Sequence, residues 1–297
     1  MEYKVAKNTS NCRKFTVRGG GNSGLKPLLQ QLLGETIGLF GRTQLNPKTI
    51  SIHRLLHRNS VIYRSAIALK LSPLWQLPPD DIAHQLTAAL LTMPQDTIAI
   101  DFMVEVVSPG WIDFQLGDRS LATVLQQLIE IPLSPSTPGN CLFSKDYNLF
   151  PIQYTHARCS SLLRLGGSGT ADAVSGGGEE GSREWNSGCR IGGVEKFFPD
   201  REGERLGFVH LAEWDLIFQI LDLLDVMSDS DQRSLVKRGF ALCHAFDAFH
   251  RSCRIWGEVK IHQPQLTKAR LGLVKVTQIL LRSLLEDCFG VPALLEL

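Results

Sequence analysis

The stretch from Leu235 to Leu297 constrains the fold most, because its apolar residues recur at helical spacing over two long segments. In the first segment, Leu235–Phe249, apolar side chains return every three to four residues and form one stripe along a helix. A turn rich in Gly, Pro and Gln follows, and a second helix is predicted to begin near Thr267 and to end before Gly290 and Pro292. Two helices joined by a short turn lie antiparallel, so this part of the chain is expected to be an all-α bundle.

The composition indicates a globular chain with room for two domains. It has 297 residues, of which 43% are hydrophobic. No apolar run approaches the roughly 20 residues of a membrane span, and residues 1–26 lack the apolar core of a secretory signal. The seven cysteines form no Cys-x-x-Cys pair. We therefore expect a cytoplasmic protein with no membrane partner.

The positive charge of the chain is concentrated near its start. Residues 1–75 contain twelve Lys or Arg and only two acids, whereas the charge of the whole chain is +1. A basic region of this kind favours a polyanionic partner. Residues 1–26, rich in Gly, Ser and Asn, are equally expected to be a flexible, solvated basic segment.

Residues 27–131 mix helical and extended patterns and are expected to form a small α+β domain. A tight Ser-Pro-Gly turn at 108–110 joins the last two strands into a hairpin. The expected helices are 28–40, 62–71 and 78–93, and the expected strands are 49–53, 98–107 and 111–116.

Residues 132–149 are expected to be a linker and 150–297 a helical domain. The first helix begins near Gln153, and another covers Glu213–Leu224. Between them, a glycine-rich insertion at 166–207 is predicted to be flexible. The fold class is therefore α+β, with a small N-terminal α+β domain carrying a β-hairpin and a C-terminal all-α helix bundle.

The helical domain carries phrases that resemble the DALR anticodon-binding domain of arginyl-tRNA synthetases. These phrases are Gln-Tyr-Thr-His-Ala-Arg at 153–158, Cys-His-Ala-Phe-Asp-Ala-Phe-His-Arg-Ser-Cys-Arg at 243–254 and Ala-Arg-Leu-Gly-Leu at 269–273. The chain departs from the family at Asp247, where Asn or His is usual, and at His250, where Tyr is usual. The resemblance implies contact with tRNA at Tyr154, His156, Arg158, Arg251, Arg254, Lys268 and Arg270.

The hairpin resembles the N-terminal additional domain of the same synthetases. The phrase that carries this likeness is Val-Ser-Pro-Gly-Trp-Ile-Asp-Phe at 107–114. In that family the hairpin reaches the D-loop corner of tRNA, which implies contacts from Ser108, Trp111 and Asp113. Asp113 stands where the family has Asn or Gln, and a carboxylate repels phosphate.

The phrases of a synthetase catalytic domain are not found in this sequence. It has no His-x-Gly-His phrase, no Lys-Met-Ser-Lys-Ser-like loop and no alternation typical of a parallel sheet. The chain is therefore expected to be no enzyme and to need no cofactor. No metal site is expected among the eight histidines.

Three functions remain open from the sequence. The first is a non-catalytic tRNA-binding protein, a synthetase paralogue in translation whose partner is tRNA, with tRNA-Arg as the candidate that the resemblance implies. The second is a protein-interaction or regulatory module that pairs with a synthetase or another protein. The third is a component of arginyl-tRNA aminoacylation that works with a separate catalytic chain.

Overall fold

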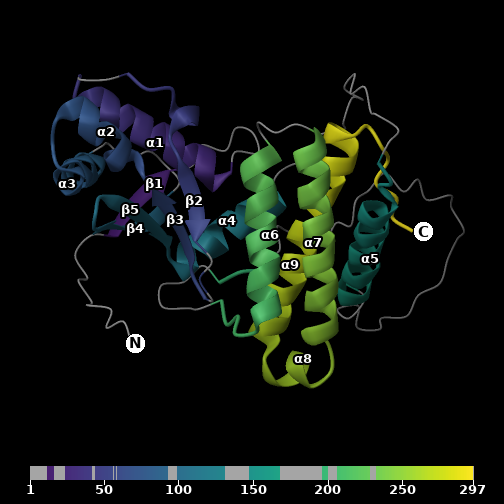
Figure 1. The fold of residues 1–297 in the computed structure, drawn as a ribbon. Coiled ribbons are helices and arrows are strands. Elements are labelled where there is room, and N and C mark those ends of the chain that lie inside the picture. The colour runs from purple at the N-terminus through teal and green to yellow at the C-terminus, as the bar shows by residue number, and fades with distance from the viewer. Residues whose placement is uncertain are drawn as a thin grey trace, which may run out of the picture.

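The computed structural model describes residues 12–16, 24–41, 44–55, 57, 59–92, 99–130, 147–167, 196–199, 206–227 and 232–296. Within these ranges the chain forms an N-terminal sheet with helices and a C-terminal helix bundle, which lie side by side (Figure 1). Most of the glycine-rich insertion, most of the basic N-terminal segment and most of the linker lie outside the described residues. The expected flexibility of those segments stays a prediction.

The N-terminal unit is built on a five-stranded antiparallel sheet in the order β1-β4-β5-β3-β2. Alternate residues of the central hairpin point toward the helices and are buried, among them Phe102, Val104, Ile112 and Phe114. The strands are β1 (Cys12–Thr16), β2 (Ile52–Leu55), β3 (Val61–Ser65), β4 (Ala99–Val107) and β5 (Trp111–Leu116). The helices are α1 (Leu25–Leu39), α2 (Ile67–Trp75), α3 (Pro79–Leu90) and α4 (Asp118–Glu130), with a 3₁₀ turn at Pro47–Thr49.

Two elements of this sheet correct the sequence expectations. The sequence pattern predicts a helix over residues 62–71, but Val61–Ser65 form the strand β3 between β2 and β5. Their burial alternates, because Val61, Tyr63 and Ser65 face the core while the residues between them face outward. The short strand β1, inside the segment expected to be flexible, pairs with β4 along its whole length.

The C-terminal unit is a bundle of long helices. Buried residues from all of its long helices form its core, Leu216, Ile217, Leu242, Phe246, Leu273 and Val274 among them. Its helices are α5 (Phe150–Gly167), α6 (Leu211–Met227), α7 (Gln232–Ser252), α8 (Glu258–His262) and α9 (Pro264–Ser283), followed by a π-helical turn at Leu284–Cys288. The α+β fold class is confirmed.

The two units pack directly against each other. Helix α4 contacts both β4 and α9, and α1 contacts α6 (Figure 1). The buried Arg54 of β2 donates to the carbonyl oxygen of Phe218 at 2.7 Å and pairs with Asp222 at 2.8 Å, both on α6. Asp225, also on α6, accepts from the Tyr63 hydroxyl and from the backbone N–H of Lys26, each at 2.8 Å.

Small residues allow close approach at this interface. A Cβ atom on Gly24 would lie 2.5 Å from the Cα of Asp225, so only glycine fits there. Phe197 and Phe198 are buried against Gly272 of α9, and the Phe197 N–H donates to Gln126 of α4 at 3.0 Å. Contacts between side chains therefore set the spacing of the two units, in addition to the peptide connection at 131–146.

Candidate nucleic-acid interface

Helix α5 presents one exposed polar and aromatic face. Phe150, Tyr154, Arg158, Ser161 and Leu165 follow one another at spacings of three or four residues, which places them on one side of the helix. The opposite side is buried against α7 and α9. The side chain of Asn148 caps the helix by accepting from the Phe150 N–H at 3.1 Å.

An aromatic pair lies at the start of this face. Tyr154 is 48% exposed and Phe150 is 55% exposed, and their rings stack with centroids 6.1 Å apart. Unpaired bases of RNA stack on exposed aromatic rings of this kind. Next to the pair lies an open pocket of about 390 Å³, lined by Tyr154, Ala157, Arg158, Ser161, Arg164 and Glu296.

Arg158 has a fixed position at the wall of this pocket. Its Nη1 donates to Asp247 Oδ1 at 2.9 Å and its Nη2 donates to His250 Nδ1 at 3.0 Å. Both partners lie on α7, one helical turn apart. Arg164 pairs with Glu296 at 2.7 Å, and this pair closes the other side of the pocket.

His156 is a structural residue of the bundle. Its ring is buried and its Nδ1 lies 2.8 Å from the carbonyl oxygen of Leu294, so Nδ1 carries the proton and donates. Burial lowers the pKa of this imidazole, so the ring is neutral at physiological pH. In the structure the side chain fixes the C-terminal tail along α5, and the tRNA contact expected of His156 stays a prediction.

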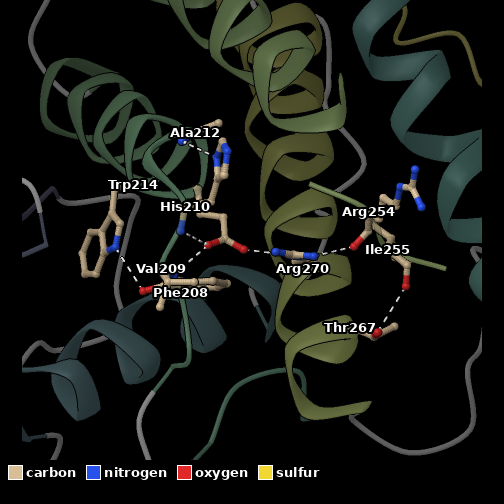
Figure 2. Close-up of polar contacts among 10 residues, drawn as sticks. Phe208, Val209, His210, Ala212, Trp214, Arg254, Ile255, Thr267 and Arg270 are labelled. Atoms are coloured by element: carbon tan, nitrogen blue, oxygen red, sulfur yellow. Dashed lines mark hydrogen bonds and ion pairs between the residues drawn. The ribbon is translucent and has the colours of Figure 1, made fainter. Parts of the chain in front are cut away.

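Arg270 is also buried, although the sequence suggested that it contacts tRNA. Its Nε donates to Glu213 Oε1 at 2.7 Å, and its Nη1 donates to the backbone carbonyl of Arg254 (Figure 2). The other oxygen of Glu213 accepts from the N–H groups of Val209 and His210 and so caps α6. The guanidinium of Arg270 therefore joins α9 to α6 and to the turn after α7, and the expected tRNA contact at Arg270 stays a prediction.

The remaining basic candidates gather at the end of the bundle, around α8. Arg251 and Arg254 are exposed, and Lys268 is half-buried one turn into α9. We call this region the basic tip; it consists of Arg251, Arg254, Lys260, His262 and Lys268, with Glu258 as its acid. Lys260 was missed in the sequence, because the short helix α8 that carries it was assigned to a turn.

The hairpin candidates do not converge on one pocket. Ser108 donates to Asp80 at 3.1 Å, at the start of α3. Both oxygens of Asp113 accept from Arg64, each at 2.6 Å, and the Arg64 guanidinium lies over the Trp111 ring, 5.6 Å from its centroid. Asp113 is therefore occupied within the sheet, and Arg64, which the sequence did not single out, is the cation of this surface.

Residues 192–297 match the family model of the DALR anticodon binding domain. The chain is also 30% identical over 154 residues to an arginine–tRNA ligase of Moorella thermoacetica. The chain is similar to this arginine–tRNA ligase over about half of its own length. The alignment covers 50% of this chain and 22% of that relative, so the chain spans about a fifth of the length of the relative it matches. No solved structure matches the chain.

The matched range includes helices α6 to α9, with Arg270 and the basic tip. Helix α5 and the hairpin lie before this range. The tRNA contacts suggested for all the candidate residues, inside the matched range and outside it, stay predictions. Among the residues that the structure describes, no helix is long and apolar enough to cross a membrane.

Proposed function

We propose that this chain is a non-catalytic tRNA-binding protein that contacts tRNA with the exposed face of α5 and with the basic tip. The observation that supports this most directly is the match of residues 192–297 to an anticodon-binding domain. The exposed Phe150–Tyr154 pair and the neighbouring pocket add a surface suited to unstacked bases. We further propose a cytoplasmic location and a role beside the translation apparatus.

The two parts of this surface have different tasks. Aromatic rings bind bases by stacking, and a side chain in a fixed position reads hydrogen-bonding groups, so the α5 face is suited to recognition. Exposed lysines and arginines attract the phosphate backbone at any sequence, so the basic tip is suited to affinity. The half-buried Arg64 on the hairpin surface offers a further cation to the same ligand.

The contribution of the basic tip is measurable as a dependence of affinity on salt. Each phosphate contact releases counterions, and the log–log slope changes by about 0.7 to 0.9 per contact. We expect Arg251→Ala with Lys268→Ala to reduce the slope for total tRNA by about one and a half. Fluorescence anisotropy at several salt concentrations measures this slope, and the melting temperature should stay unchanged because neither side chain is fully buried.

The matched control is Lys48→Ala with Lys70→Ala. Both lysines are exposed and lie in the N-terminal unit, away from the basic tip. This control should keep the slope of the parent protein. Equal slopes in all three proteins, or no binding of tRNA by the parent at low salt, would remove the proposed function.

We also propose that the chain does not itself activate arginine. The N-terminal unit ends with α4 at Glu130 and the bundle is described from Tyr147, so only residues 131–146 connect them. A domain with a hydrophobic core of its own has at least about 50 residues, which is more than this connection holds. Purified protein is therefore expected to give no arginine-dependent exchange of pyrophosphate into ATP. Exchange above a control preparation that lacks the protein would contradict this proposal.

A second candidate function is docking to another protein, such as a synthetase. The exposed Phe150 and Tyr154 lie near the C-terminal tail, where Leu294 and Leu295 are also exposed. Apolar residues grouped on a surface favour a protein partner. Binding to a separate catalytic chain would be one form of this function. A parent protein that binds no tRNA at low salt would favour it.

A further inference from the structure

Two side chains of α7 bind the same arginine of α5. Asp247 and His250 both accept a hydrogen bond from the guanidinium of Arg158. The carboxylate of Asp247 and the imidazole of His250 therefore act together as the two hydrogen-bond acceptors of one arginine.

The two contacts orient Arg158 without consuming its capacity to donate. A guanidinium carries five N–H groups, and the contacts to Asp247 and His250 use two of them. The side chain is about one-third exposed and lines the pocket beside Tyr154. The remaining N–H groups are thus available to a ligand, and a side chain that is already fixed loses less entropy on binding.

We propose that Asp247 and His250 are positioning residues that hold Arg158 as a fixed donor toward RNA groups in the pocket, and that protonation of His250 removes one of the two anchors. This inference rests on the proposed function and assigns regulation by pH to the same site. The negative charge of Asp247 also offsets the charge of Arg158, so Arg158 is suited to directional hydrogen bonds more than to general attraction of phosphate.

The chemistry of the imidazole makes the arrangement sensitive to acid. Nδ1 of His250 accepts from Arg158, so this nitrogen must be unprotonated. Burial lowers the pKa of His250, and the positive charge of Arg158 on α5 lowers it further, whereas Asp247 on the same helix raises it. The third neighbour, the ring of Phe246, stacks on the imidazole with centroids 6.3 Å apart and is uncharged. At neutral pH the imidazole is the acceptor, and in acid it becomes a second cation beside Arg158.

The test compares His250→Asn with the parent protein from pH 8 to pH 5. The side-chain oxygen of Asn can take the place of Nδ1 as an acceptor, and it does not titrate in this range. The readout is the ratio of the affinity for total tRNA to the affinity for polyuridylate, since general attraction of phosphate changes both affinities together. We expect this ratio to fall about tenfold in the parent as pH drops, which corresponds to the loss of one well-oriented charged hydrogen bond. We expect it to stay constant in His250→Asn.

The matched control is His244→Asn, because His244 lies on the same helix and is exposed. It should keep the pH profile of the parent. Asp247→Ala should lower the ratio at every pH. A ratio that falls equally in the parent and in His250→Asn would overturn the positioning role and leave tRNA binding standing. A parent that binds no tRNA would remove the function and the positioning role together.

Discussion

Replacing Arg270 by Met is expected to lower the free energy of unfolding by about 3–5 kcal/mol, because the substitution leaves a charged carboxylate buried without its partner. Glu213 is fully buried and Arg270 is 7% exposed. The guanidinium is also the donor to the backbone carbonyl of Arg254, so its loss leaves that carbonyl unsatisfied. Denaturation with urea, followed by circular dichroism, measures the change.

The double variant Glu213→Gln with Arg270→Met separates the cost of the buried charge from the cost of lost contacts. The neutral amide still accepts from an N–H group at the start of α6, where Glu213 now caps Val209 and His210. We expect the double variant to be more stable than Arg270→Met alone. If the free energy of unfolding of Arg270→Met fell by less than about 1 kcal/mol, the ion pair would contribute no more than an exposed surface pair does. The salt dependence of tRNA binding should be unchanged in a folded Arg270 variant.

The helical spacing around Arg270 could have predicted its burial, but not its ion pair with Glu213. Thr267, Arg270 and Val274 are three or four residues apart and so share one face of α9, a spacing that would have placed Arg270 among the buried residues. Its partner Glu213 lies 57 residues earlier in the chain, on a different helix. No local pattern relates two charges at that separation, and the ion pair therefore could not be predicted.

Local sequence patterns predicted only part of the sheet. The alternating pattern and the turn at 108–110 predicted the hairpin β4–β5, and the helix expected from residue 78 agrees with the start of α3 at Pro79. The strand β3 was missed because Ile62 and Ala66–Leu71 also fit a helical stripe, and only pairing with β2 and β5 decides between the two. Tertiary contacts override local propensity in such short apolar segments.

In the candidate interface, sequence resemblance identified Tyr154 and Arg158, and the structure places both at one pocket. It did not identify Phe150, which precedes Tyr154 by one turn and would have followed from helical spacing.

The contact between the sheet unit and the helix bundle could not be predicted from the sequence. Arg54, Tyr63 and Asp225 belong to elements far apart in the chain, and nothing in their neighbourhoods indicates that they meet.

Asp225 makes this contact sensitive to pH, and Asp225→Asn should remove much of that sensitivity. Burial raises the pKa of its carboxyl from 3.8 to about 6, against the lowering effect of the donors Lys26 N–H and Tyr63. The folded protein therefore binds the proton more tightly than the unfolded chain. The stability that this group contributes is fully present below pH 3.8 and is lost as pH rises through 6. The loss amounts to about 3 kcal/mol, because a shift of one pKa unit corresponds to 1.36 kcal/mol.

The Asn variant keeps one acceptor oxygen for the Lys26 N–H, and its amide can donate to the Tyr63 hydroxyl, which rotates to accept. Because the amide is neutral at every pH, the stability of Asp225→Asn relative to the parent should rise by about 2 kcal/mol between pH 4.5 and pH 7.5. Urea denaturation at several pH values measures this difference. The control Asp215→Asn changes an exposed carboxylate on the same helix and should follow the parent. If the free energy of unfolding changed with pH in the same way in Asp225→Asn and in the parent, Asp225 would titrate as an ordinary surface carboxylate. Acid would then not strengthen the contact between the sheet and the bundle.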